Sequence, residues 1–486
     1  MGFGRCVRVM SSARRIVDVS RSSVAVPFAL AFALVLAGCA GGGVHGKPGA
    51  AGVRDPYFPK LGNGGYDVTH YGLTLDYEPS ARQLRGTAVI TARATSDLSA
   101  FDLDLKGLEV HGVTVEGREA RWNRAGQELT VHPHDGLDEG KTFRVTVRYS
   151  GTPETLTDVD GSQEGWLRTA DGSLALGEPT GSMTWFPGNN HPSDKASYDI
   201  TVTVPKGLHV VSNGELTSET TKGGRTTFAW HTAEPMASYV ATVAIGRYDI
   251  SRSTTGKGLP VYVAVDPTQA EAGKKVPDRI AEIIDWAEYN FGPYPFSSTG
   301  AIVDRPGDAG YALETQNRPF FPGTTDTRIL VHELAHQWFG DSVTPRSWRD
   351  MWLNEGFATY AEWLWQEDHG GDSTQDVFDA LYAGDYYKSG AGNEALWAFP
   401  PGDPPSAAEI SDPPVYDRGA MVLHKIRQKV GDDTFHDIVR GWAAAHRHGN
   451  ADSGGFTAFV EKKAPDEDFG VIWKDWLYGE GKPAKP

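Results

Sequence analysis

The sequence His332-Glu333-Leu334-Ala335-His336 constrains this 486-residue chain more than any other feature. In an α-helix, residues i and i+4 lie one above the other, so both imidazoles point the same way and can bind one metal ion. Glu333 lies about 100° around the helix from His332, where it can reach a water molecule bound to that metal without being a metal ligand itself. A solvated helix with two surface histidines would show the same five residues. The motif therefore predicts a metal site on a helix, provided that a third ligand exists.

Glu355 is the candidate third ligand. Eighteen residues separate it from His336, enough for the end of one helix, a turn and the start of an antiparallel second helix. Two histidines and one carboxylate form a catalytic zinc site, because they leave a fourth position open for water. In isolation, Glu355 also fits an acid favoured in the first turn of a helix by the helix dipole. Together the three residues predict one catalytic Zn²⁺ ion.

The segments 332–341 and 352–358 resemble the aminopeptidase N-type gluzincin family of zinc metallopeptidases. Segments 66–68, 185–187, 191–196 and 291–296 extend this resemblance, which covers residues 60 to 480 approximately. It implies a multidomain β plus α/β chain, with a saddle-like N-terminal β-sandwich domain followed by a thermolysin-like, α-rich zinc peptidase domain. Only 70 residues follow Tyr416. The chain thus resembles a short bacterial lipoprotein form without the long helical C-terminal domain, and a more open site is expected.

Three further site residues follow from the resemblance. Tyr416, in Val415-Tyr416-Asp417-Arg418-Gly419, matches a tyrosine whose hydroxyl donates to the oxyanion, and one such donor is worth roughly 3–4 kcal/mol. Glu314 matches the acid that binds the free α-amine of the substrate. Its neighbours depart from the family's Gly-x-Met-Glu-Asn pattern, which puts side-chain specificity in doubt more than amine binding. Glu178 falls where the family has a Gln or Glu that also touches the amine.

Sequence patterns divide the chain near residue 250. Short alternating segments rich in β-branched and aromatic residues predict an all-β domain over 59–250. Apolar residues at helical spacing predict an α-rich catalytic domain over 251–486, which includes helices at 278–291, 329–339, 355–368, 376–387 and 420–430. A small sheet is expected around residues 261–265 and 301–304.

The first 38 residues read as an export signal. Five arginines precede the apolar run 24–36, which is short for a membrane span, and Leu36-Ala37-Gly38-Cys39 resembles a bacterial lipobox. This pattern predicts a lipoprotein signal peptide over 1–38, lipidation at Cys39 and a flexible tether over 39–58. The protein would then be exported and held on the bacterial cell membrane, facing the extracellular or periplasmic side. An ordinary signal peptide or a terminal membrane anchor is the alternative.

The chain has 46 basic and 63 acidic residues and a net charge of −17. This balance argues against nucleic acid as a partner, because phosphates are bound by lysine and arginine. We therefore predict a zinc aminopeptidase acting on peptides with a free N-terminus, in which Glu333 transfers the proton. A zinc endopeptidase of the same fold and a non-catalytic surface-binding lipoprotein are the alternatives.

Overall fold

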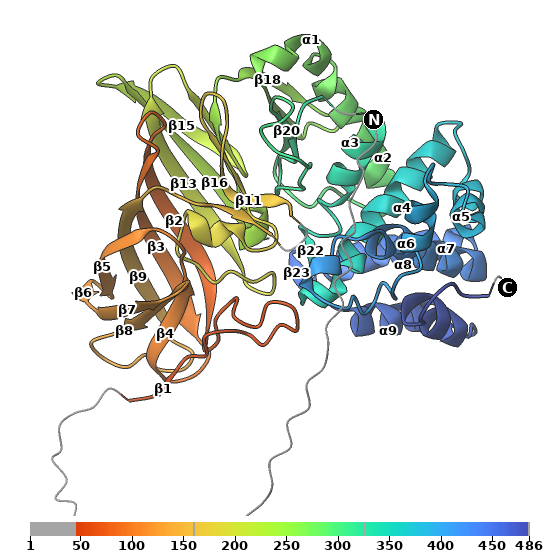
Figure 1. The fold of residues 1–486 in the computed structure, drawn as a ribbon, viewed down its shortest axis with the longest axis horizontal. Helices are drawn as coiled ribbons and strands as arrows, with labels where there is room; N and C mark the ends of the chain where they lie inside the picture. The colour runs from red at the N-terminus through yellow and green to blue at the C-terminus, as the bar shows by residue number, and fades with distance from the viewer. Residues whose placement is uncertain (1–44, 159–160, 325, 485–486) are drawn as a thin grey trace, which may run out of the picture. The chain divides into compact units, whose positions relative to one another are not determined.

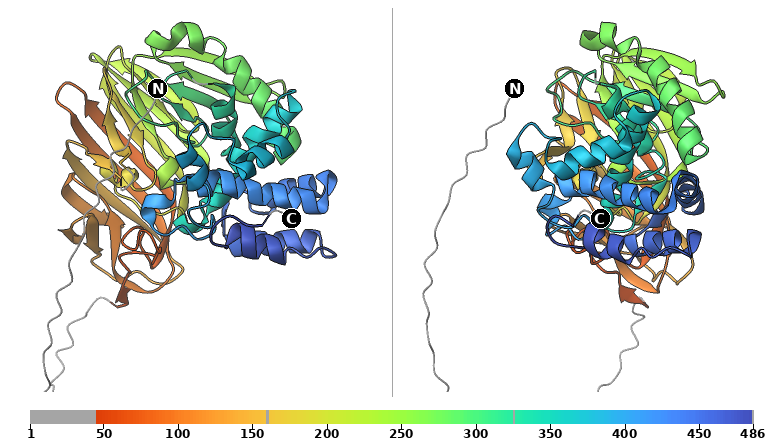
Figure 2. Two further views of the ribbon diagram at one scale, coloured as in Figure 1. Left: turned by 45° about the vertical axis from the view of Figure 1, so that its right-hand side comes forward. Right: turned by 90° about the vertical axis from the view of Figure 1, so that its right-hand side faces the viewer.

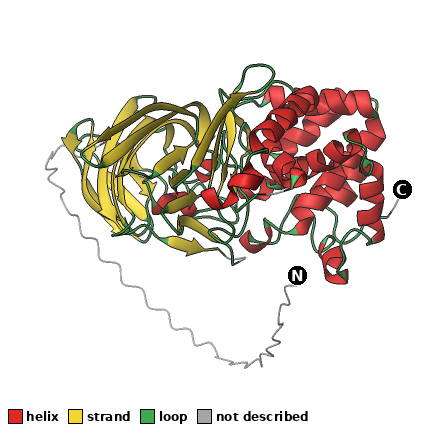
Figure 3. Cartoon of the chain, turned by 90° about the horizontal axis from the view of Figure 1, so that it is seen from above, coloured by secondary structure: helices red, strands yellow, loops and turns green. Residues whose placement is uncertain are grey.

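The computed structural model describes residues 45–158, 161–324 and 326–484, so the predicted signal peptide and Cys39 lie outside the described part. The described residues belong to one compact unit. Strands dominate its first half and helices its second half, as Figures 1 and 3 show. This arrangement confirms the predicted fold class of an N-terminal β-rich domain followed by an α-rich domain.

A long twisted sheet forms the body of the β-rich part. Buried and exposed residues alternate along its strands, as expected of a sheet with one face on the core. Most neighbours are antiparallel, and β2 and β13 pair in parallel. Its order is β15 (Glu215–Lys222), β16 (Arg225–Ala237), β13 (Lys195–Pro205), β2 (Tyr66–Glu78), β3 (Gln83–Ala94), β9 (Thr142–Gly151), β5 (Glu109–Val115) and β6 (Arg118–Glu119).

Two smaller sheets complete the β-rich part. One runs β1 (Lys47–Pro48), β4 (Leu98–Asp104), β8 (Glu128–His132) and β7 (Arg121–Ala125). The other runs β10 (Thr155–Thr157), β11 (Gln163–Arg168), β12 (Ser173–Leu176), β17 (Val243–Gly246) and β14 (His209–Ser212). The 3₁₀ helix η1 (Gly181–Thr184) follows β12 and contacts β11. The segment between β12 and η1 contains Glu178.

The α-rich part begins with a four-stranded sheet of the order β18 (Asp249–Thr254), β19 (Pro260–Val265), β20 (Thr299–Val303) and β21 (Phe320–Phe321). A short parallel pair, β22 (Val343–Pro345) and β23 (Gly449–Ala451), lies farther along the chain. The α-helices are α1 (Ala270–Gly273), α2 (Val276–Phe291), α3 (Thr327–Ala335), α4 (Trp352–Asp368), α5 (Thr374–Ala383), α6 (Gly390–Ala395), α7 (Gly419–Val430), α8 (Asp432–Ala445) and α9 (Ser453–Lys463). The last of these helices, α7 to α9, are drawn in blue in Figure 2 and pack side by side.

Two predicted helices are shorter than the sequence pattern suggests. The helix expected at 329–339 ends at Ala335, so His336 occupies its C-cap and the chain turns there. The helix expected at 376–387 ends at Ala383, because Gly384 adopts a left-handed conformation with φ of 85°. No helix among the described residues has the length and apolar character needed to cross a membrane.

Residues 45–58, expected as part of a flexible tether, pack against the fold. β1 pairs with β4. Asp55 is buried, and its carboxylate accepts hydrogen bonds from the hydroxyl of Ser347 (2.8 Å) and the amide of Trp348 (3.1 Å). His191 of the β-rich part lies 3.3 Å from the same oxygen. The glycine-rich composition did not indicate this, because these partners of Asp55 are distant in sequence.

Candidate active site

His332, His336 and Glu355 converge on one point, where α3 packs against α4. Asp326 caps α3 by accepting from the Ile329 amide (3.0 Å), and the helix then brings both histidines to one face. Glu355 lies in the first turn of α4, and its Oε2 is 3.2 Å from His332 Nε2 and 3.4 Å from His336 Nε2. All three side chains are buried or nearly so. The ligand atoms lie within 4.8 Å of one another, the arrangement of a three-ligand metal site.

The outer nitrogens of both histidines fit a bound metal. His336 Nδ1 lies 3.0 Å from the carbonyl oxygen of Phe339, which can only accept, so in the neutral imidazole Nδ1 carries the proton and Nε2 offers its lone pair to the cluster. His332 Nδ1 lies 2.7 Å from Glu362 Oε1. Such partners orient histidine ligands and raise their basicity. The donor set of two imidazoles and one carboxylate is the set expected for Zn²⁺.

The charged groups of the triad are coupled to one another. Burial alone would raise the pKa of Glu355, but His336 and His332 hold it below the usual range for glutamate. In turn Glu355 holds the pKa of His336 above its usual range, against the effect of burial. Each group thus stabilises the charged form of the other, so that a proton is held where these atoms meet. A bound metal ion would replace that proton, because ligation needs the unprotonated imidazole nitrogen.

A second group of carboxylates adjoins the triad. One oxygen each from Glu178, Glu314 and Glu355 lies within 4.8 Å of the other two, so Glu355 belongs to both clusters. Glu314 is buried and accepts from the side-chain amide of Asn354 (3.0 Å). Burial, together with the charge of Glu314, raises the pKa of Glu178 well above its usual range. Carboxylates this close repel one another, so a positive group placed among them is strongly favoured.

Glu333 lies between the two clusters. One of its oxygens is within 4.8 Å of Glu314 and His336 ligand atoms. Burial raises the pKa of Glu333 to about 8. A carboxyl group of this kind can both accept and return a proton near neutral pH, which general acid–base catalysis needs.

Tyr416 comes from a π-helix, η6 (Pro414–Arg418), that leads into α7. Its ring lies parallel to that of His332, with centroids 6.0 Å apart and planes 14° apart. Burial, with the nearby Glu355, raises the pKa of Tyr416 well above its usual range, so the hydroxyl keeps its proton. Arg418 is fully buried and donates to the carbonyl oxygens of Phe399 (3.1 Å) and Trp476 (3.0 Å), which ties η6 to the end of the chain.

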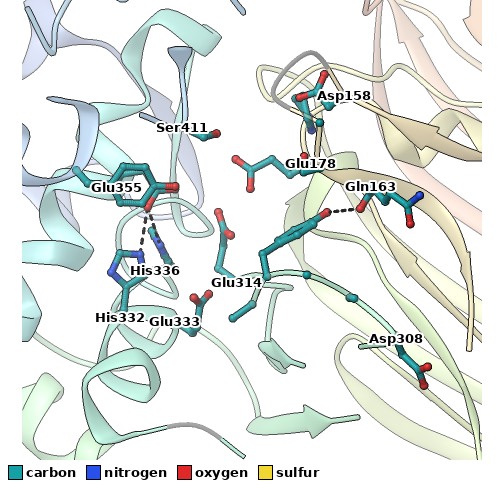
Figure 4. Close-up of a pocket in the computed structure, with 18 of the residues that line it drawn as sticks. Asp158, Gln163, Glu178, Asp308, Glu314, His332, Glu333, His336, Glu355 and Ser411 are labelled. Atoms are coloured by element: carbon teal, nitrogen blue, oxygen red, sulfur yellow. Dashed lines mark hydrogen bonds and ion pairs between the residues drawn. The ribbon is translucent and has the colours of Figure 1, made fainter. Parts of the chain in front are cut away.

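The metal-binding triad, the adjoining carboxylates and Tyr416 line one cavity of about 610 Å³. The seven active-site residues predicted from the sequence all line it: Glu178, Glu314, His332, Glu333, His336, Glu355 and Tyr416. Figure 4 shows Glu178 and Glu314 facing each other across the space beside the histidines. The Tyr311 hydroxyl donates to the Gln163 carbonyl (3.1 Å), which joins the loop before Glu314 to the β-rich part. Cys39 lies outside the described residues.

Sequence reasoning missed two supporting residues. Glu362 follows Glu355 by seven positions, two turns along the same face of α4, and this spacing could have indicated its contact with His332. Asn354, which binds Glu314, gives no such signal, because its partner lies in a distant loop.

Comparisons with known proteins agree with this geometry. The sequence profile of the peptidase M1 N-terminal domain matches residues 67–240, and that of the peptidase family M1 domain matches residues 317–476. The crystal structure of the M1 zinc metallopeptidase from Deinococcus radiodurans superimposes with a TM-score of 0.81 at 31% identity, covering 90% of this chain and 98% of that one. A mutant of that enzyme bound to a Tyr-Ser-Ala substrate gives a TM-score of 0.79 at 30% identity, with coverage of 90% and 99%.

Curated relatives are more distant and longer. Leucyl aminopeptidase of Saccharolobus solfataricus is 25% identical over 86% of this chain and 54% of its own length. Endoplasmic reticulum aminopeptidase 1 of Homo sapiens is 24% identical over 78% of this chain and 44% of its own length. The chain thus spans about half the length of the curated relatives that it matches. The two family profiles and the near-complete match to the Deinococcus structure show that the chain belongs to the M1 zinc metallopeptidase family.

Proposed function

We propose that this protein is a zinc-dependent aminopeptidase that removes the N-terminal residue of peptides. One observation carries the proposal: the metal-binding triad and the carboxylates Glu178 and Glu314 face the same cavity and share Glu355. A peptide ammonium group held by these carboxylates places the first peptide bond beside the triad. Several relatives are aminopeptidases, which supports the same function.

Each residue has a distinct role in this mechanism. His332, His336 and Glu355 would hold one Zn²⁺ ion, which when bound supplies a Lewis acid for the scissile carbonyl and for water. Glu178 and Glu314 bind the α-ammonium group and disfavour chains that lack it. Glu333 accepts a proton from the attacking water and returns it to the leaving amine. The Tyr416 hydroxyl donates to the oxygen that becomes negative.

Hydrolysis of aminoacyl-7-amido-coumarins and of their N-acetylated counterparts tests the proposal. The free-amine substrates should be cleaved and the acetylated ones should not. Chelation should abolish the rate and added zinc should restore it. Glu333→Gln keeps the three ligands and should still bind zinc while losing turnover. Cleavage of both substrate types would instead indicate an endopeptidase, and no cleavage by the zinc-loaded protein would refute an enzymatic function.

We also propose that the protein is exported and anchored by a lipid at Cys39. The lipobox-like sequence before Cys39 supports this proposal. Mass spectrometry of the protein from bacterial membranes should find a diacylglyceryl group on Cys39, and Cys39→Ser should release the protein from the membrane fraction. Membrane retention of the serine variant would contradict lipid anchoring.

A further inference from the structure

A buried carboxylate that does not line the cavity holds the segment that carries Glu178. Glu164 lies on β11 and is only 1% exposed. One of its oxygens accepts from the backbone amides of Thr180 (2.8 Å) and Gly181 (2.9 Å), and the other accepts from the Thr180 hydroxyl. These three hydrogen bonds fix the chain two residues beyond Glu178.

The same segment is also bound from its other side. The Asn190 side-chain amide donates to the Thr180 carbonyl oxygen (3.0 Å). The amide, hydroxyl and carbonyl groups of Thr180 are therefore all bound by side chains of the β-rich part. Pro179 restricts the backbone between Thr180 and Glu178. The direction of the Glu178 side chain thus depends on how firmly Thr180 is held.

A carboxylate at this position is costly. Burial raises the pKa of Glu164 to about 8, against the lowering effect of its hydrogen bonds to Thr180. An apolar side chain would avoid the desolvation cost but would leave two backbone amides without acceptors, that of Gly181 buried and that of Thr180 partly buried. Glu164 therefore stabilises this segment through the hydrogen bonds that its two oxygens accept.

We propose that Glu164 is a positioning residue for amine recognition: it fixes the segment from Glu178 to Gly181 so that the Glu178 carboxylate faces Glu314. This inference rests on the proposed aminopeptidase function. Glu164 itself touches no substrate; it acts through Glu178. A 1 Å displacement of a binding group can cost up to about 10²-fold in rate, so the consequence is measurable.

The test uses the zinc-loaded, full-length enzyme and one aminoacyl-coumarin substrate. Glu164→Ala should lower kcat/KM about tenfold or more, mainly by raising KM. Glu164→Gln should restore most of the loss, because its carbonyl oxygen can accept both amides and its NH₂ can donate to the Thr180 hydroxyl. Thr180→Val, which removes one hydrogen bond and nearly preserves shape, should give an intermediate KM.

Glu367 provides a matched control. Its carboxylate accepts from the amide and hydroxyl of Thr374 (2.8 Å each), the same two donors of the same residue type, and it does not line the cavity. Glu367→Ala should lower the melting temperature and leave KM within about twofold of the parent enzyme, since no amine-binding group depends on it.

A double-mutant cycle with Glu178→Ala gives the decisive result. In that background Glu164→Ala should change kcat/KM by less than about twofold, because the group that it positions is absent. The inference would be overturned if Glu164→Ala kept its full effect in that background, or if the KM of the Glu164→Ala single variant equalled that of Glu367→Ala. Either result would leave the proposed function standing. A parent enzyme that cleaves no free-amine substrate would refute both.

Discussion

The substitution Gly356→Ala tests how the site is assembled. Gly356 follows the ligand Glu355 on α4, and Gly419 begins α7 just after the π-helix that carries Tyr416. The two glycines touch: a Cβ atom at residue 356 would lie 2.9 Å from the carbonyl carbon of Gly419 and 3.1 Å from its Cα. The distance between the metal ligand and the tyrosine therefore depends on the absence of a methyl group at this contact.

The size of the effect follows from that contact. Carbon atoms pack at about 3.5–4.0 Å, so a methyl group here must push α4 and α7 apart by roughly 0.5–1 Å. Both partners are backbone, so no side chain can move aside. Overpacking of this kind costs about 1–3 kcal/mol, whereas alanine regains about 1 kcal/mol of helix propensity in α4. Catalysis has no such offset, because misplacing a group by about 1 Å can cost 10²-fold in rate.

Gly356→Ala should therefore reduce kcat by about 10- to 100-fold while the melting temperature falls by only a few degrees. Zinc content should stay at that of the parent protein, since His332, His336 and Glu355 remain. Gly390→Ala is the control: Gly390 also lies in a helix, and nothing lies within 4 Å of a Cβ built there. A Gly356→Ala enzyme with parental kcat would show that the α4–α7 contact does not set the position of Tyr416.

Three further predictions concern single side chains. Tyr416→Phe should lower kcat by about 10²–10³-fold at unchanged zinc content, and a parental rate would exclude the hydroxyl as oxyanion donor. Glu362→Gln should weaken zinc binding by about 10- to 100-fold in a chelator competition, because Glu362 orients His332; unchanged affinity would contradict that role. Burial alone would raise the pKa of Asp55, but hydrogen bonds from His191, Ser347 and the amides of Tyr57 and Phe58 together lower it to about 2. Asp55→Asn should therefore lose about 2 kcal/mol of stability above pH 4 in urea denaturation. The difference should shrink as the pH falls from about 4 towards about 2, and a difference independent of pH would refute the assignment.

The metal triad could be predicted from the sequence because its geometry is largely local. The positions of His332 and His336 on one helix face follow from helix periodicity alone. The nearness of Glu355 needed only a turn and a second helix, although the chain between them also forms β22 and a 3₁₀ turn, Trp348–Asp350. Resemblance to a family supplied Glu178, Glu314 and Tyr416, whose partners lie far away in sequence.

The roles of residues that act through long-range contacts could not be predicted, because no local sequence pattern indicates such contacts. Asp55 meets Ser347 and Trp348 almost 300 positions later, and neither periodicity nor composition around residue 55 indicates it. Glu164 ends up beneath the Glu178 segment because β11 and β12 pair and η1 folds back over β11. Such contacts depend on the tertiary fold and could not be derived from local propensity.

The glycines within the motifs are better explained by the structure than by backbone flexibility. Gly340, four residues after His336, has a φ of 128°, and a Cβ there would overlap the side-chain oxygen of Asn354, the residue that binds Glu314. Gly356 and Gly419 similarly allow the segments of Glu355 and Tyr416 to touch. Each of these glycines lies where the chain carrying one functional group passes against the chain carrying or supporting another. They set the spacing of the site, so the motif surrounding the chemical residues is itself part of the geometry that catalysis requires.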